Sequence, residues 1–127
     1  MGKRIMFERA GYGPVEIEIA HGVIAGWTGR NADAVQHHIE ELAAIGVPAP
    51  STVPLYYRAS DLMFTTAPVI QCLDDTSSGE AEPTLIDDGN RLYLGLGSDH
   101  TDRKLEAYSV AHSKQICPKP LAPVLWD

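Results

Sequence analysis

The feature that most constrains the fold is a segment in which apolar and acidic residues alternate strictly, Val15-Glu16-Ile17-Glu18-Ile19. A period of two places the apolar side chains on one face of an extended strand and the carboxylates on the other. The run therefore predicts a strand with one buried face. A short His21-Gly22 link separates it from the more apolar Val23-Ile24-Ala25-Gly26-Trp27, so we predict that the two segments form a hairpin.

Further strands are predicted along the chain. Residues 53–58 and 69–73 are rich in apolar and aromatic side chains that favour strands. Residues 83–86 and 91–96 flank Asp87-Asp88-Gly89-Asn90, a cluster of turn-forming residues, which predicts a second hairpin.

One helix has clear start and stop signals. Asn31 is a favoured N-cap, and Asp33 in the first turn complements the helix dipole. An apolar stripe follows at helical spacing and ends before Gly46 and two prolines. The stripe consists of Val35, Ile39 and Leu42.

A second helix is predicted from Asp99 or Thr101, either of which can cap it, to about His112. The tail from Cys117 to Pro123 contains three prolines and is expected to be extended or looped. The predicted fold class is α+β, mainly β, with mixed sheets and one or two helices in a single domain over residues 1–127.

Charge, hydropathy and cysteine spacing indicate which classes of function are disfavoured. The net charge of −7 and the absence of a Lys/Arg cluster disfavour nucleic acid. No apolar run has the length needed to span a membrane, and the N-terminus lacks the apolar region of a signal peptide. Cys72 and Cys117 have no metal-type spacing, so two reduced thiols and a cytoplasmic location are expected.

Three carboxylates form the candidate metal site. Glu80 and Glu82 are two residues apart and share a face of an extended segment, where two like charges raise each other's pKa unless a cation lies between them. Asp99 follows a Gly-Leu-Gly turn and adds a third oxygen ligand of the kind that Mg²⁺ prefers. The alternatives are a solvated strand face, a helix cap at Asp99, and a rival ligand set containing His100 and Asp102.

His38 and Glu41 form a candidate acid–base pair. They lie three residues apart on the predicted helix, so their side chains are within reach of each other. A neighbouring carboxylate would raise the pKa of the imidazole and fix its orientation, which suits a general base but also suits an ordinary helix pair.

Several short motifs occur in the order typical of the fumarylacetoacetate hydrolase superfamily, and the chain resembles an uncharacterised bacterial branch that shares them. In that pattern the usual spacing makes His37 an alternative to His38. The motifs are Gly29-Arg30-Asn31, His38-Ile39-Glu40-Glu41-Leu42, Pro54-Leu55-Tyr56-Tyr57-Arg58, Glu80-Ala81-Glu82, Ser98-Asp99 with Arg103, and Lys114 with Pro120-Leu121-Ala122-Pro123.

The resemblance implies a largely β fold with Mg²⁺ or Mn²⁺ bound by Glu80, Glu82 and Asp99. It also implies catalytic roles for His38, Glu41 and Lys114. His38 and Glu41 would activate a water, and Lys114 would stabilise a substrate oxyanion. The substrate-binding residues would be Tyr57, Arg58 and Arg103.

The function expected from this resemblance is a metal-dependent, hydrolase-type enzyme. Its substrate would be a small keto or carboxylate compound that reacts through an enolate-like intermediate, by C–C bond hydrolysis or a related decarboxylation or hydration. The motifs extend nearly to residue 127, so the chain is expected to be the N-terminal portion of a longer catalytic domain and to form a homodimer that covers open sheet edges. The alternative is a truncated or degenerate relative that acts only as a folding and association module.

Overall fold

The computed structural model describes residues 2–27, 31–51 and 54–127. Gly29 and Arg30 of the Gly29-Arg30-Asn31 motif, and Val53 of the predicted strand 53–58, lie outside these residues. The strands are β1 (Lys3–Arg9), β2 (Gly13–Ile19), β3 (Gly22–Gly26), β4 (Leu55–Ala59), β5 (Phe64–Thr65), β6 (Ser77–Ser78), β7 (Ala81–Asp87), β8 (Leu92–Ser98), β9 (Thr101–Asp102), β10 (Lys119–Pro120) and β11 (Val124–Leu125). The helices are α1 (Ala32–Ala43), the 3₁₀ turn η1 (Asp61–Met63), α2 (Arg103–Glu106) and α3 (Val110–Gln115).

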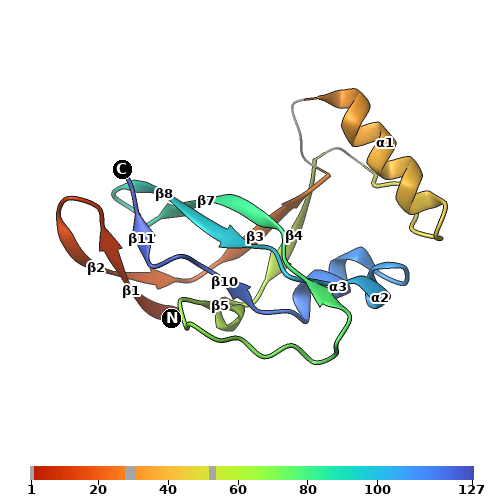
Figure 1. The fold of residues 1–127 in the computed structure, drawn as a ribbon. Coiled ribbons are helices and arrows are strands. Elements are labelled where there is room, and N and C mark those ends of the chain that lie inside the picture. The colour runs from red at the N-terminus through yellow and green to blue at the C-terminus, as the bar shows by residue number, and fades with distance from the viewer. Residues whose placement is uncertain (1, 28–30, 52–53) are drawn as a thin grey trace.

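The strands form several small sheets, and the predicted α+β, mainly-strand class is confirmed (Figure 1). The described part of the chain has one three-stranded sheet in the order β11-β1-β2, and four pairs: β3–β4, β7–β8, β6–β9 and β5–β10. None of the described helices has the length and apolar character required to cross a membrane.

The predicted strand 15–19 is confirmed within β2, but the predicted hairpin with residues 23–27 is wrong. β2 pairs antiparallel with β1, where Ile17 lies opposite Ile5. β3 pairs instead with β4, so that Ile24 lies opposite Tyr57. The apolar faces decide these partners, because pairing with β1 buries Ile17 beside Ile5 in one core cluster.

The second predicted hairpin is confirmed as β7–β8, in which Leu85 lies opposite Leu94. Its turn is held by Asp88, whose carboxylate accepts hydrogen bonds from the backbone N–H groups of Asn90 and Arg91. The strand predicted over residues 69–73 is wrong: this segment forms no described strand, and Val69 is 81% exposed.

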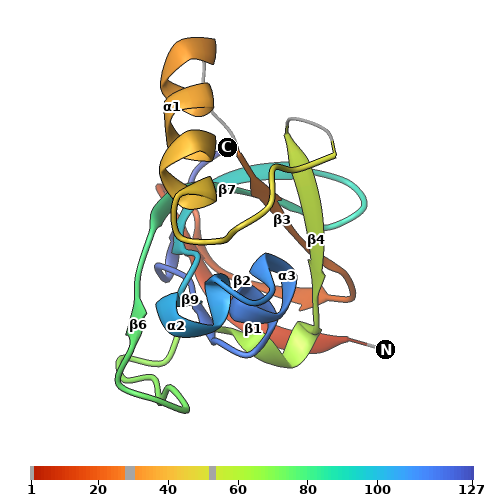
Figure 2. The same cartoon turned by 90° about the vertical axis from the view of Figure 1, so that its right-hand side faces the viewer.

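Helix α1 is confirmed with Asn31 as its N-cap, whose side chain accepts hydrogen bonds from two backbone N–H groups of the first turn. Figure 2 shows α1 at one end of the molecule, above α2 and α3. Its buried residue Ile39 packs with Trp27 and Val47 in a small core cluster.

The single helix predicted from Asp99 or Thr101 to His112 is wrong. The segment forms two short helices, α2 capped by Asp102 and α3 capped by Ser109. The extended tail is confirmed, because β10 and β11 pair with β5 and β1. The larger core cluster is formed mainly by side chains of β1, β2, β7, β8 and β11. It consists of Ile5, Phe7, Ile17, Ile86, Tyr93, Leu121 and Leu125.

Candidate functional site

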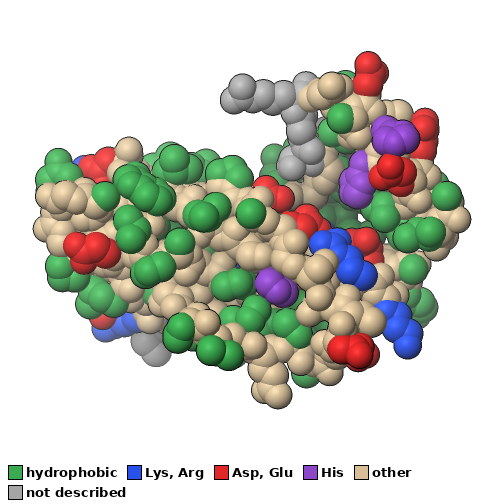
Figure 3. Space-filling model, viewed as in Figure 1, with side chains coloured by type: hydrophobic (Ala, Val, Ile, Leu, Met, Phe, Trp, Pro, Cys, Tyr) green, Lys and Arg blue, Asp and Glu red, His purple; other side chains and the backbone are tan. Residues whose placement is uncertain are grey.

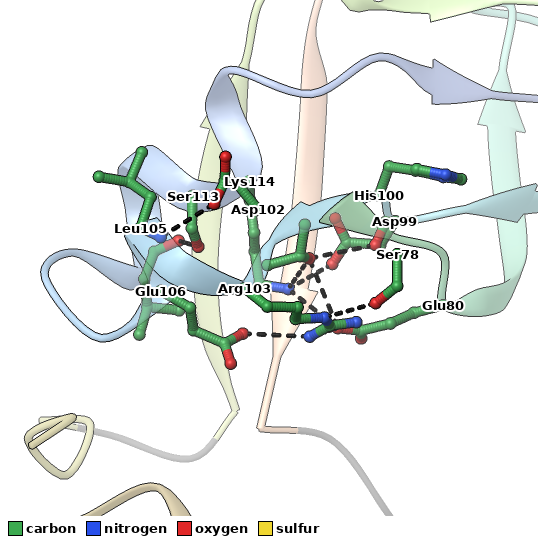
Figure 4. Close-up of polar contacts among 12 residues, drawn as sticks. Ser78, Glu80, Asp99, His100, Asp102, Arg103, Leu105, Glu106, Ser113 and Lys114 are labelled. Carbon is green, nitrogen blue, oxygen red and sulfur yellow. Dashed lines mark hydrogen bonds and ion pairs between the residues drawn. The ribbon is translucent and has the colours of Figure 1, made fainter. Parts of the chain in front are cut away.

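A cluster of charged side chains gathers where β7, β8, β9, α2, α3 and β10 meet (Figure 4). The register of the β7–β8 hairpin sets Ala81 opposite Ser98, which places Glu80 and Asp99 at the same end of the hairpin. The backbone N–H of Asp99 donates to the carbonyl of Glu80 at 2.8 Å and fixes that end.

Asp99 is the centre of this cluster and is 6% exposed. Its Oδ2 accepts a hydrogen bond of 2.6 Å from Lys114 Nζ. Its Oδ1 lies 2.9 Å from Lys119 Nζ, but the two atoms are not aligned as a hydrogen bond. Two buried lysines therefore share one buried carboxylate, and removal of Asp99 would leave both positive charges buried without this partner.

Arg103 joins two other carboxylates on the neighbouring side of the cluster. Its Nη1 lies 2.9 Å from Glu80 and 3.2 Å from Glu106, and Figure 4 shows Arg103 between them. Its Nε donates to Ser78 Oγ at 2.7 Å. Lys114 Nζ also lies 3.7 Å from Glu80, so the two ion-pair systems are connected.

Glu82 is half-buried and differs from its neighbours, because its carboxylate forms no ion pair with any residue that the structure describes. Burial raises the pKa of Glu82, the negative charges of Glu80 and Asp99 raise it further, and Lys114 opposes them. This is the like-charge effect predicted from the sequence. The surroundings of Glu82 consequently favour its protonated form more than water does.

Two cavities open beside the cluster, and Glu82 contributes to the walls of both. The larger is a cleft of about 420 Å³. Apolar side chains line most of it, including Val23, Phe64 and Leu121, while Glu82, Asp99 and Lys119 supply charged groups. The smaller cavity, of about 150 Å³, is lined by Trp27, His38, Leu42, Glu80, Glu82, Glu106, Val110 and Lys114, together with Ala25 and Gly26.

The structure places His38 beside the smaller cavity but gives Glu41 a different closest partner. His38 Nδ1 is 3.9 Å from Glu41, whereas His37 Nε2 is 2.9 Å from it. The His38 ring packs against Trp27, with the ring centroids 5.6 Å apart. Glu41 thus orients His37 on the exposed side of α1, and Trp27 is the neighbour that positions His38.

Tyr57 and Arg58 do not come together as a substrate site. Tyr57 is buried, and its hydroxyl accepts a hydrogen bond of 2.9 Å from Trp27 Nε1. Arg58 is the next residue of β4, is exposed, and lines neither described cavity. Successive side chains of a strand point to opposite faces, which separates these two residues.

The predicted metal site does not form a ligand set in this arrangement. The described residues contain no group of three or more His, Cys, Asp or Glu side chains that could hold a metal ion. Glu80 and Asp99 are instead bound by Arg103, Lys114 and Lys119, whose positive charges lie close to their oxygens.

Sequence reasoning missed Lys119 and Glu106. Lys119 is 3% exposed, and its Nζ donates to the carbonyl of His100 at 2.5 Å. Lys119 follows Pro118 in a proline-rich tail, where the only available signal was a lysine flanked by prolines. Glu106 is buried against Arg103, and its spacing of three residues from that arginine on a helix was the usable signal.

The fold and the cluster define an α+β protein whose charged residues meet beside two cavities. A family model matches residues 25–127, and the chain belongs to that family, described as "Protein of unknown function (DUF2848)". No curated protein and no solved structure matches the chain.

The family match corrects the resemblance to the fumarylacetoacetate hydrolase superfamily. The matching family is an uncharacterised one, and nothing in the comparisons supports membership of the fumarylacetoacetate hydrolases. The motifs that carried the resemblance are short, and each of them alone is a weak signal.

Proposed function

We propose that the protein is an enzyme that acts on a small keto or carboxylate substrate and forms an enolate-like intermediate. The observation that carries this proposal is the position of Glu82. It is the carboxylate of the cluster without an ion pair among the described residues, its pKa is raised, and it lines the larger cleft. A carboxylate of this kind suits the removal of a proton next to a carbonyl group.

The cleft supplies the other parts of such a reaction. Apolar walls formed by Val23, Phe64 and Leu121 suit the carbon skeleton of a substrate. Lys119 provides positive charge beside Asp99, and positive charge at this point suits a substrate carboxylate or a developing enolate oxygen. C–C bond hydrolysis, decarboxylation and hydration all use an intermediate of this type.

Deuterium exchange tests the proposal before the natural substrate is known. An enzyme that forms an enolate replaces the α-protons of a keto acid with deuterium in D₂O, which proton NMR detects. We expect exchange with wild-type protein and a loss of roughly a hundredfold or more in Glu82→Gln, since removing a general base has an effect of that order. Glu40→Gln, which changes an exposed carboxylate of α1, is the matched control.

The same assay examines the Mg²⁺ or Mn²⁺ dependence predicted from the sequence. Because lysine and arginine bind Glu80 and Asp99, we expect exchange to proceed without added metal and in the presence of a chelator. If deuterium exchange requires Mg²⁺ or Mn²⁺, this result would support metal binding by Glu80, Glu82 and Asp99. No exchange with any keto acid of a broad panel would contradict the proposed function.

We also propose the homodimer and the cytoplasmic location predicted from the sequence. Both cysteines are free thiols, as expected in a reducing compartment. The outward face of the β7–β8 hairpin carries a set of exposed apolar side chains, which supports association between copies. These are Leu85, Leu92, Leu94 and Leu96.

A non-catalytic association module is the second candidate function, and the same apolar face favours it. Figure 3 shows hydrophobic side chains spread over the half of the molecule away from α1. An association module would form the dimer without exchanging substrate protons. The two candidates are therefore separated by the deuterium exchange assay.

A further inference from the structure

We propose that Lys119 forms a Schiff base with the carbonyl carbon of a small keto acid bound in the larger cleft. This inference rests on the proposed function and names the group that receives the electrons of the enolate-like intermediate. Such an intermediate needs a group that receives its electrons, and Lys119 is a lysine in the wall of the larger cleft. A protonated imine formed by a lysine can receive these electrons.

The position of Lys119 suits a nucleophile. Its side chain is 3% exposed to bulk solvent, yet it forms part of the wall of the 420 Å³ cleft. β10 pairs with β5 in a register that sets Lys119 opposite Phe64, another residue of that wall. The hydrogen bond from Nζ to the carbonyl of His100 and the ion pair with Asp99, a residue of the cleft wall, fix the position of the amine.

The surroundings of Lys119 favour its uncharged form more than a solvated lysine would. Burial lowers its pKa and the positive charge of Lys114 lowers it as well, although the ion pair with Asp99 acts in the opposite direction. Lys114 and Lys119 lie at the two oxygens of the same carboxylate, so their two ammonium groups are held close together, although Lys114 also lies 3.7 Å from Glu80. A desolvated lysine beside a second cation is a recognised means of activating an amine.

Schiff-base formation also needs an acceptor for the hydroxyl group of the intermediate and a proton donor, and we assign these roles to Asp99 and Glu82. Asp99 Oδ1 is a buried oxygen without a hydrogen bond in the described structure, and Asp99 lines the same cleft. A hydroxyl group formed next to Lys119 would provide the missing donor. Glu82 lines the cleft too and forms no ion pair with a described residue, so its carboxyl group is available to deliver a proton to that hydroxyl as it leaves.

The step balances without an external oxidant or reductant. The Lys119 ammonium first gives a proton to Glu82. Its free amine then adds to the substrate carbonyl carbon, a C–N bond forms, and the proton lost by nitrogen passes to the former carbonyl oxygen. The resulting hydroxyl takes the proton held by Glu82 and leaves as water. The products are one water and a protonated imine, which withdraws electrons from the adjacent carbon.

Borohydride trapping tests this inference. Wild-type protein is incubated with acetoacetate or pyruvate, which represent 3-oxo and 2-oxo acids, then reduced with sodium borohydride and analysed by mass spectrometry. We expect one reduced adduct per chain, located at Lys119 by peptide mapping. We expect at least tenfold less adduct in Lys119→Arg, which keeps the positive charge, and no loss in Lys104→Arg, which changes an exposed lysine.

The peptide map of the wild-type protein decides the question even if Lys119→Arg does not fold. No adduct with either acid, or an adduct spread equally over exposed lysines, would overturn the Schiff base. Deuterium exchange without an adduct would overturn the Schiff base and leave the proposed function intact. An adduct at Lys119 without deuterium exchange would support the Schiff base and contradict proton removal by Glu82.

Discussion

At the scale of single residues, the raised pKa of Glu82 makes the free energy of unfolding depend on pH. In the folded chain its carboxyl keeps a proton to higher pH than in the unfolded chain, because burial and the charges of Glu80 and Asp99 raise its pKa. The folded state therefore binds more protons over that range, and the free energy of unfolding falls as the pH rises through the raised pKa.

Glu82→Gln should remove this pH-dependent loss of stability. We expect its melting temperature to exceed that of the wild type by about 1–3 °C at pH 8, a small effect because the half-buried carboxyl is partly screened by water. The difference should disappear as the pH falls below the ordinary glutamate value of 4.5. Thermal unfolding followed by circular dichroism over this pH range, with Glu40→Gln as control, measures it. A variant less stable than the wild type at pH 8 would contradict this account.

The structural roles of single residues could be predicted where the signal lay in the neighbouring sequence. The Asn31 cap followed from a residue preference, and the proximity of Glu80, Glu82 and Asp99 followed from spacing and a turn. The lysines around Asp99 could not be predicted in the same way. Lys119 lies twenty positions beyond Asp99, and only the folded backbone brings the two within 2.9 Å.

At the scale of elements, α1 is a helix whose start depends on one side chain. Asn31 accepts hydrogen bonds from the backbone N–H groups of Asp33 and Ala34 at 3.0 and 3.1 Å. The helix buries only Ile39 fully, so little tertiary packing compensates for a lost cap.

Asn31→Ala should destabilise α1 by about 1 kcal/mol, because two N–H groups lose their acceptor. Amide hydrogen exchange in the first turn of α1 and urea denaturation measure the effect. Asn31→Asp, which retains an acceptor oxygen, should remain close to the wild type. Equal protection of the first turn in Asn31→Ala would show that the cap does not hold this helix.

Elements whose partners are near in sequence were predictable, and those with distant partners were not. The turn at residues 87–90 specified the β7–β8 hairpin because its residue types favour a reversal of the chain. β1 was missed because Met6 interrupts the alternation with an exposed apolar side chain. The long helix predicted up to His112 is divided after Glu106, and Ser109 caps the start of the second helix, α3.

At the scale of the whole molecule, the proposed dimer would use the outward face of β7–β8. β7 pairs only with β8 among the described strands, so its other edge is available for pairing. A two-fold axis passing through this apolar face would place the face of one copy against the same face of the other. Association through an uncharged face also avoids the repulsion expected between surfaces of a chain with a net charge of −7.

We expect light scattering to give the mass of a dimer for the wild type and of a monomer for Leu94→Glu, because the substitution places a charge in the apolar face. Leu62→Glu, which changes an equally apolar exposed residue in η1, should remain dimeric. A monomeric wild type, or an unchanged mass for Leu94→Glu, would contradict an interface at this face.

The chain has two tryptophans, and their surroundings differ sharply. Trp27 is buried, has a left-handed backbone with φ of 59°, and contacts His38 beside the smaller cavity. Trp126 is about half exposed near the C-terminus, where its backbone pairs with that of Leu94. Variants that keep only one of the two tryptophans can therefore report on each of these sites separately by fluorescence. With Trp126 replaced by Phe, the remaining indole becomes an optical probe of whatever enters the small cavity.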